Sequence, residues 1–248
     1  MKIVLAQIQA AKGDIDKNIE KHCRFINTAV TNGADAIFFP ELSVTGYEPD
    51  LAKKLATTAD DGRLAIFQSL SDENNIVIAV GLPIVSNNGI NISAVIFQPN
   101  LARQVYSKQY LHDDELPYFI PGNKQLYINV GTNKIALAIC YESLLPQHAE
   151  TASEQGINMY LALVAKSANG VLKAYRHYPD MAEKYAIPVL MANCVGYCDN
   201  FQSAGSSAVW NKDGNLVNRL DENSEGLLLF DTETEQTITV LQTENVFM

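Results

Sequence analysis

The sequence of 248 residues contains few cysteines and no long apolar run. Its cysteines are too sparse for a disulfide framework, which favours a reducing compartment; they are Cys23, Cys140, Cys194 and Cys198. No apolar run approaches the roughly 20 residues of a membrane span, and the apolar start over residues 1–7 turns polar too soon for a secretory signal. These absences predict a cytoplasmic protein.

Basic residues are also scarce, because 18 Lys and Arg stand against 28 Asp and Glu, giving a formal net charge of −10. Binding to nucleic acid or to an anionic membrane needs a basic face, and the sequence shows none. The charge is better explained by solubility. We therefore expect a small-molecule partner, with no nucleic acid and no membrane.

Metal-binding patterns are absent as well. The histidines have no ligand spacing; they are His22, His112, His148 and His177. Cys194 and Cys198 form a close pair, but no second Cys/His pair stands at a matching spacing, so they do not predict a zinc site. The sequence predicts neither a metal nor an organic cofactor.

What the sequence does contain is an alternation of apolar strands and amphipathic helices. Apolar runs predict strands at residues 2–8, 36–39, 76–81, 90–97, 103–107, 134–139, 159–164, 188–193, 208–210, 226–230 and 237–241. Helical patterns cover residues 14–32, 62–74, 143–155 and 175–186. Strands that are apolar throughout need cover on both faces, so the pattern predicts an α/β fold. No linker interrupts it, and we expect one domain over residues 1–248.

Three residues whose side chains are suited to catalysis lie just after predicted strands. They are Glu41, Lys108 and Cys140. Taken singly, each has an ordinary explanation: a helix cap or solvated loop, a surface charge, and a small buried hydrophobe. Strand ends are nevertheless where α/β proteins place functional groups. The helix predicted at residues 143–155 would also bring its positive end close to a Cys140 thiolate.

Taken together and in this order, the motifs resemble the nitrilase superfamily of carbon–nitrogen hydrolases, in its amidase-like branch. The resemblance covers nearly the whole chain and rests on Phe39-Pro-Glu41-Leu with Gly46-Tyr47, Tyr106-Ser-Lys108, Ile139-Cys140-Tyr-Glu142, Asn193-Cys-Val-Gly196 and Gly205-Ser-Ser207. It implies a four-layer αββα sandwich. It also implies a homodimer, since members of the family commonly pair across a two-fold axis.

The resemblance further implies a role for each motif residue. Cys140 matches the nucleophile, Glu41 the general acid and base, and Lys108 the donor to the oxyanion, together with the backbone N–H of Tyr141. Glu115 matches a second glutamate that holds the lysine in position. Tyr47, Tyr118 and Tyr141 are expected to shape a narrow substrate pocket.

The expected reaction is therefore hydrolysis of a small amide through a cysteine thioester, with release of ammonia or an amine. N-carbamoyl hydrolysis and nitrile hydrolysis on the same site are the alternatives. Residues 141–145 lack the arginine that grips a substrate carboxylate in some relatives. Lys166, Lys173 and Arg176 are candidates to replace it, although surface positions are the default for such residues. A catalytically silent binding or regulatory module is the alternative of another class, and the presence of all three strand-end residues argues against it.

Overall fold

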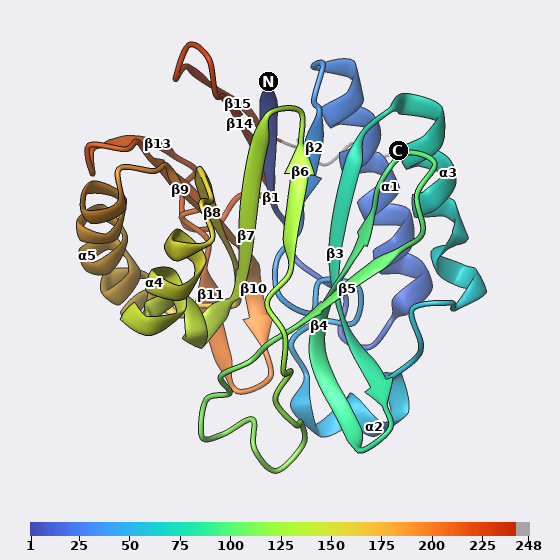
Figure 1. Ribbon diagram of the computed structural model, residues 1–248. Helices are drawn as coiled ribbons and strands as arrows, with labels where there is room; N and C mark the ends of the chain where they lie inside the picture. The colour runs from blue at the N-terminus through green and yellow to red at the C-terminus, as the bar shows by residue number, and fades with distance from the viewer. Residues whose placement is uncertain (242–248) are drawn as a thin grey trace.

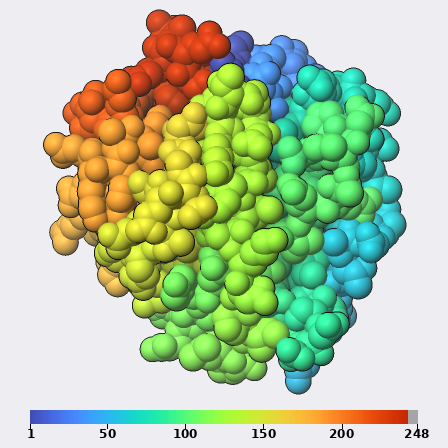
Figure 2. All heavy atoms as spheres, in the orientation of Figure 1, coloured from blue at the N-terminus to red at the C-terminus, as the bar shows by residue number. Residues whose placement is uncertain are grey.

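The computed structural model describes residues 1–241 and consists of two large β-sheets packed face to face, with helices covering both outer faces (Figure 1). This is the predicted αββα arrangement, which the structure confirms. In the space-filling view, the segments of the two sheets abut over this face of the molecule without a dividing groove (Figure 2). No helix within residues 1–241 is long and apolar enough to cross a membrane.

The first sheet has seven strands in the order β15-β14-β1-β2-β3-β4-β5. Their bounds are β1 (Lys2–Gln7), β2 (Ala36–Phe38), β3 (Val77–Ser86), β4 (Gly89–Phe97), β5 (Gln104–Ser107), β14 (Gly226–Asp231) and β15 (Thr237–Leu241). Its outer face is covered by α1 (Ile15–Thr31) and α3 (Ala65–Asn74). Helix α1 begins where predicted, because the Asp14 side chain accepts a hydrogen bond from the backbone N–H of Lys17 at 3.1 Å.

The second sheet has six strands in the order β13-β12-β9-β8-β7-β6. Their bounds are β6 (Tyr127–Val130), β7 (Asn133–Ile139), β8 (Met159–Val164), β9 (Val189–Asn193), β12 (Ala208–Trp210) and β13 (Leu216–Arg219). Helices α4 (Pro146–Glu154) and α5 (Ala168–Tyr185) cover its outer face. A separate two-stranded ribbon, β10 (Val195–Cys198) with β11 (Phe201–Ala204), extends at one end of the sandwich. Short helical segments η1 (Pro49–Leu51), α2 (Ala52–Leu55) and η2 (Gly62–Leu64) precede α3.

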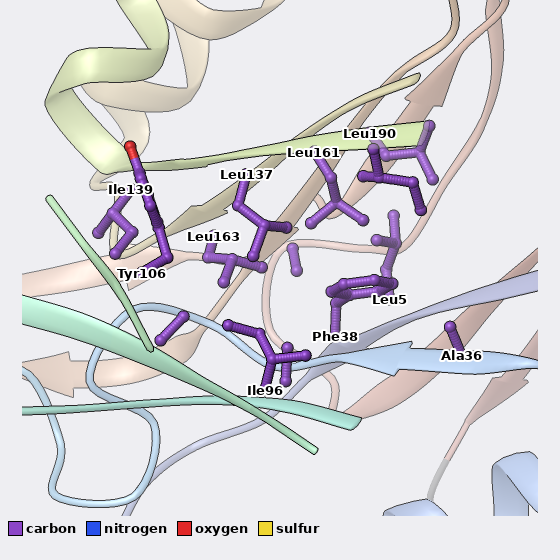
Figure 3. Packing of buried hydrophobic residues seen from close by; sticks show 14 of the residues in the cluster. Leu5, Ala36, Phe38, Ile96, Tyr106, Leu137, Ile139, Leu161, Leu163 and Leu190 are labelled. Carbon is purple, nitrogen blue, oxygen red and sulfur yellow. The ribbon is translucent and has the colours of Figure 1, made fainter. Parts of the chain in front are cut away.

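The hydrophobic core lies in three layers, one between the sheets and one under each helical layer. Strand β3 shows why its sequence is apolar throughout: Val77 and Ala79 face the other sheet, whereas Ile78 and Val80 face α1 and α3. Figure 3 shows side chains of the two sheets meeting in the central layer, with Leu5 and Phe38 opposite Leu161 and Leu190.

The segment after Cys140 differs from the prediction. A helix was expected from residue 143, but Cys140–Leu144 forms a 3₁₀ turn (η3) and α4 begins only at Pro146. Proline suits the first position of a helix and keeps the residue before it extended, so Leu145 interrupts the helical path with φ −92° and ψ 116°. The positive end of an α-helix therefore does not lie directly at Cys140, contrary to our expectation.

Other differences are smaller. Helix α5 begins at Ala168, well before the predicted start at 175, and strands β6, β10, β11 and β13 were not predicted. Strands β10 and β11 have only four residues each, and their burial does not alternate between successive residues, so the sequence pattern could not distinguish them from a loop.

Candidate active site

The three strand-end residues come from both sheets, and their side chains interact with one another. Glu41 follows β2, Lys108 follows β5, and Cys140 follows β7 of the other sheet. Lys108 Nζ lies 2.8 Å from Glu41 Oε1 and 2.6 Å from Glu115 Oε1, and these three side chains are at most 1% exposed. A pair of carboxylates thus balances one buried ammonium group next to the cysteine.

Cys140 has an unusual backbone conformation that the sequence did not reveal. Its φ is +50°, in the left-handed region that residues other than glycine rarely occupy, directly after the extended Ile139. Such a conformation costs on the order of 1 kcal/mol and turns the chain sharply from the strand into the 3₁₀ turn. The turn is held by Ser143, whose Oγ donates to the Cys140 carbonyl at 2.5 Å and contacts Tyr178 Oη at 2.6 Å. Cys140 Sγ is aimed at the Ala165 carbonyl oxygen, 3.7 Å away.

Burial shifts the protonation equilibria of these groups. It raises the pKa of Glu41 to about 7, although the adjacent Lys108 ammonium acts in the opposite direction. Burial and the nearby Glu41 carboxylate also raise the pKa of the Cys140 thiol to about 11. Burial opposes the charged form of Lys108, but Glu41, Cys140 and Glu115 outweigh it and raise the Lys108 pKa. The resting cysteine is therefore a neutral thiol beside a carboxyl group that titrates near neutrality.

One oxygen of Glu41 is available for chemistry. Its Oε1 accepts from Lys108, whereas its Oε2 is buried and has no hydrogen-bond partner among residues 1–241. The Cys140 side chain contributes to lowering the Glu41 pKa, so the thiol is within interaction range of this carboxylate. A buried acceptor without a partner is costly to a fold and is a common mark of a functional group.

Among the acidic residues of the 113–115 run, the structure brings Glu115 to the site. Its Oε1 accepts from Lys108 and from Tyr47 Oη at 2.9 Å, and its Oε2 accepts from the His112 backbone N–H at 2.8 Å. Asp114 is exposed and contacts His112 Nδ1 at 2.7 Å. Glu115 is therefore the second carboxylate that holds Lys108 in place, beside Glu41.

A cavity of about 350 Å³ opens over the cysteine. Its lining includes Tyr47, Glu115, Cys140, Tyr141 and Lys166. The Tyr141 ring packs edge-on against His112, with ring centroids 5.3 Å apart. A volume of this size suits a small ligand.

Tyr118, the third expected pocket tyrosine, does not line this cavity. Its side chain is 37% exposed and its hydroxyl donates to Asp50. His177 does not line the cavity either. Glu41, whose pKa the Cys140 side chain affects, remains the candidate base for the thiol.

Sequence reasoning missed the part played by Glu142, which is fully buried below the cysteine turn. Its Oε1 accepts from Tyr106 Oη at 2.5 Å and from the Ile139 backbone N–H at 2.7 Å. Its Oε2 accepts from the backbone N–H groups of Gln109 and Tyr110 at 2.6 and 3.2 Å. One carboxylate thus ties the end of the Lys108 strand to the turn that carries Cys140. The signal was a carboxylate two residues after the cysteine, within an otherwise apolar stretch.

The Cys194 and Cys198 side chains lie beside each other with Sγ atoms 3.4 Å apart, and Cys194 Sγ is also 3.2 Å from Ser203 Oγ. Within residues 1–241, no group of three or more His, Cys, Asp or Glu side chains is arranged to hold a metal ion.

Known proteins share both this sequence pattern and this fold. A family model described as carbon–nitrogen hydrolase matches residues 2–240. A nitrilase of Pyrococcus abyssi is 24% identical, over 91% of this chain and 87% of that protein. The glutamine-dependent NAD(+) synthetase of Thermotoga maritima is 25% identical over 97% of this chain but only 43% of its own length. The chain therefore spans less than half of the synthetases that it matches.

Solved structures agree on the fold. A variant of an amidase from Nesterenkonia sp., in complex with butyramide, superposes with a TM-score of 0.85 at 22% identity, covering 95% of this chain and 92% of the amidase. At this identity the likeness shows a shared fold. The family model carries the assignment, because its match extends from the first strand through the last strand of the sandwich. This chain belongs to the carbon–nitrogen hydrolase family.

Proposed function

We propose that this protein is a thiol amidohydrolase that cleaves the C–N bond of a small amide through a thioester on Cys140. The observation that carries the proposal is the hydrogen-bonded Glu41–Lys108–Glu115 cluster, of which Glu115 lines the cavity together with Cys140. Glu41 Oε2 has no hydrogen-bond partner among residues 1–241, and the Cys140 side chain interacts with this carboxylate. A nucleophile, a proton acceptor with a pKa near 7 and a fixed ammonium group are the three parts that amide cleavage needs.

Acylation begins when Glu41 accepts the thiol proton of Cys140 as sulfur attacks the carbonyl carbon. Because the thiol has a higher pKa than the carboxyl group, the thiolate is a minor species at rest and forms as the C–S bond forms. The carbonyl electron pair moves onto oxygen, where Lys108 Nζ and the backbone N–H of Tyr141 stabilise the negative charge. Glu41 then donates its proton to the amide nitrogen, the C–N bond breaks, and ammonia or an amine leaves a thioester.

Deacylation uses the same residues with water. Glu41 takes a proton from a water molecule, whose oxygen attacks the thioester carbon. The tetrahedral adduct collapses by breaking the C–S bond, the carboxylic acid leaves, and Glu41 returns its proton to the sulfur of Cys140. The cycle consumes one water and leaves every protein group as it began.

Nitrile and N-carbamoyl substrates remain the alternatives on this site, since a nitrilase is among the relatives. Glutamine is a further amide to test, because the longer relatives are glutamine-dependent synthetases. The single domain, the cytoplasmic location and the homodimer also stay predictions, as does a substrate-binding role for Tyr118, which the cavity geometry does not support.

The test is ammonia release, together with intact mass, on a panel of short aliphatic amides, glutamine, N-carbamoyl compounds and nitriles. The wild-type protein should release ammonia and accumulate a mass increase equal to the acyl group. Cys140→Ala should do neither, and Lys108→Met should lose about a hundredfold in kcat/KM because one oxyanion donor is gone. Equal release by wild type and Cys140→Ala would remove the cysteine from the mechanism. Silence across the panel, with Cys140 inert to iodoacetamide, would favour the binding-module alternative.

A further inference from the structure

A second buried lysine lies at the cysteine. Lys166 follows strand β8 and is 4% exposed, although surface exposure was the default expectation from sequence. Its Nζ lies 3.9 Å from Cys140 Sγ and 3.5 Å from the Cys140 carbonyl oxygen, and the side chain lines the cavity. It reaches this place because β8 runs parallel to β7 in the second sheet, so the residues just beyond both strands are neighbours.

The main chain holds Lys166 firmly in this position. Its backbone N–H donates to Asn193 Oδ1 at 2.8 Å, and its carbonyl accepts from Ser203 Oγ and from the backbone N–H of Ala204, both at 3.0 Å. Gly170 makes room for the side chain, because a Cβ there would lie 3.1 Å from Lys166 Cβ and 3.3 Å from its Cγ. The lysine is thus built into the cavity wall.

The two buried lysines differ in what balances their charge. Lys108 has the Glu41 and Glu115 carboxylates within 2.8 Å. Lys166 has no carboxylate within 4.0 Å among residues 1–241, and its two contacts are a carbonyl oxygen and a sulfur at long range. A buried ammonium group without a counter-ion is unfavourable, so an anion that binds at this position would stabilise it.

We propose that Lys166 binds an anionic group on the acyl part of the substrate, so that the preferred amides carry a carboxylate one or two carbons from the scissile carbonyl. This inference rests on the proposed amidohydrolase function and names its substrate class. Once the acyl carbon is bonded to Cys140 Sγ, an ammonium 3.9 Å from that sulfur is within hydrogen-bond reach of atoms just beyond the carbonyl. A carboxylate farther along the acyl chain would lie beyond hydrogen-bond reach of Lys166 Nζ.

The alternative role for Lys166 is to stabilise the Cys140 thiolate without binding the substrate. The two roles differ in one respect: stabilisation of the thiolate accelerates every electrophile equally, whereas recognition of an acyl carboxylate favours anionic electrophiles over neutral ones. The ratio of two matched rates therefore separates them.

Iodoacetate and iodoacetamide provide that ratio without any need for hydrolysis. Both alkylate the thiolate, displace iodide and place a carboxylate or an amide one carbon from sulfur. Alkylation of Cys140 is followed by mass spectrometry of its peptide, which distinguishes it from the other cysteines. The wild-type ratio of iodoacetate to iodoacetamide rate should exceed the Lys166→Met ratio by about tenfold or more, as loss of a charge-assisted hydrogen bond predicts.

Lys173→Met is the matched control, because Lys173 also lines the cavity but is exposed on α5. Its ratio should stay within about threefold of wild type, since an exposed charge is screened. Lys166→Gln, which keeps a polar side chain while losing the charge, should behave like Lys166→Met and serves if the methionine variant fails to fold. A ratio that is unchanged in both Lys166 variants overturns the proposal, as does an equal change in Lys173→Met.

Hydrolysis then separates this inference from the function on which it rests. Succinamate should be a better substrate than its neutral isostere 4-methylpentanamide, by about tenfold or more in kcat/KM, and Lys166→Met should abolish the preference. Turnover of both amides without preference leaves the amidohydrolase standing and rejects the anion site. An alkylation ratio that depends on Lys166, without turnover of any amide, supports the anion site and rejects the hydrolase.

Discussion

Two buried carboxylate clusters meet at the Cys140 turn, and they are balanced in different ways. The proposed catalytic cluster, Glu41, Lys108 and Glu115, pairs two carboxylates with an ammonium group and leaves Glu41 Oε2 without a hydrogen-bond partner among residues 1–241. The framework cluster, Glu142 with Tyr106, His148 and Tyr160, surrounds one carboxylate with uncharged donors. Burial lowers the pKa of His148 to about 4, so that the imidazole beside Tyr106 stays neutral.

The comparison teaches that burial alone does not mark a catalytic carboxylate. Burial raises the pKa of both Glu41 and Glu142. The difference lies in their partners: four hydrogen bonds from Tyr106 Oη and three backbone N–H groups occupy both oxygens of Glu142. A carboxylate whose two oxygens both accept hydrogen bonds is held in place, whereas an oxygen without a hydrogen-bond donor can accept a proton. This difference supports the proposed chemical role of the first cluster and favours a positioning role for the second.

The largest expected effect comes from Glu41→Gln. Removing the general base should lower kcat/KM for an amide substrate by about 10³-fold. The fold should tolerate the change, because an amide oxygen can still accept from Lys108 at the 2.8 Å position and Glu115 still balances the ammonium. Steady-state kinetics and thermal unfolding on the same preparation measure both. A variant that keeps more than about a tenth of the activity contradicts the role of Glu41.

The matched change Glu142→Gln should reverse that outcome. Both oxygens of Glu142 face donors, so the new NH₂ group must oppose a backbone N–H or the Tyr106 hydroxyl. We expect a loss of about 2–3 kcal/mol in the free energy of unfolding, measured by urea denaturation. The loss of activity at a temperature where the variant is folded should be smaller than in Glu41→Gln. An equal or greater loss of activity would place Glu142 in the chemistry itself and end the distinction between the clusters.

The pH dependence sharpens the comparison further. Glu41 accepts a proton only when ionised, so kcat/KM should fall about tenfold per pH unit below its pKa of about 7. The sign for stability is opposite: the folded protein holds this proton up to about pH 7, while the unfolded chain loses it near 4.5, so Glu41 weakens the fold as pH rises across that window. Glu142→Gln should leave the kinetic midpoint in place. If the midpoint of the kcat/KM profile shifts in Glu142→Gln, the group that titrates is not Glu41 alone, and Glu41 is not the base.

The contrast between the clusters also shows what sequence could and could not predict. Glu41, Lys108 and Cys140 stood out because each lies at the end of a predicted strand, which is a local property, and their predicted roles came from the resemblance of the ordered motifs to the nitrilase superfamily. The burial of Lys166 depends on β8 lying next to β7, and the role of Glu142 depends on the backbone of Gln109 and Tyr110 arriving from the other sheet. Such contacts join segments far apart in the chain, so no local pattern reports them.

The structure likewise separates tyrosines that sequence treats alike. Tyr47 and Tyr118 both lie outside the strands and helices, yet one hydroxyl reaches the buried Glu115 and the other reaches Asp50 outside the cavity lining. The left-handed backbone at Cys140 was equally hidden, because nothing about a cysteine predicts positive φ.

The smallest expected effects come from deleting one tyrosine hydroxyl in each cluster. Tyr47 donates to Glu115 Oε1 at 2.9 Å and Tyr106 donates to Glu142 Oε1 at 2.5 Å, so Tyr47→Phe and Tyr106→Phe remove the same bond from the two settings. In Tyr47→Phe, Lys108 still satisfies Glu115 Oε1, and unfolding should become easier by no more than about 1 kcal/mol. Activity should nevertheless fall about fivefold, because Glu115 positions the lysine at the oxyanion.

Tyr106→Phe should show the opposite balance. It removes a donor to Glu142 and the hydroxyl contact of His148 Nε2 at 3.0 Å, so two buried polar groups lose a partner at once. The expected loss of unfolding free energy is about 2 kcal/mol, with kcat/KM within about threefold of wild type. The informative comparison is which of the two variants loses more unfolding free energy and which loses more activity. If Tyr106→Phe lost more activity than Tyr47→Phe while both were fully folded, the framework cluster would have to share in catalysis, because a difference in stability alone cannot alter the rate of a folded enzyme.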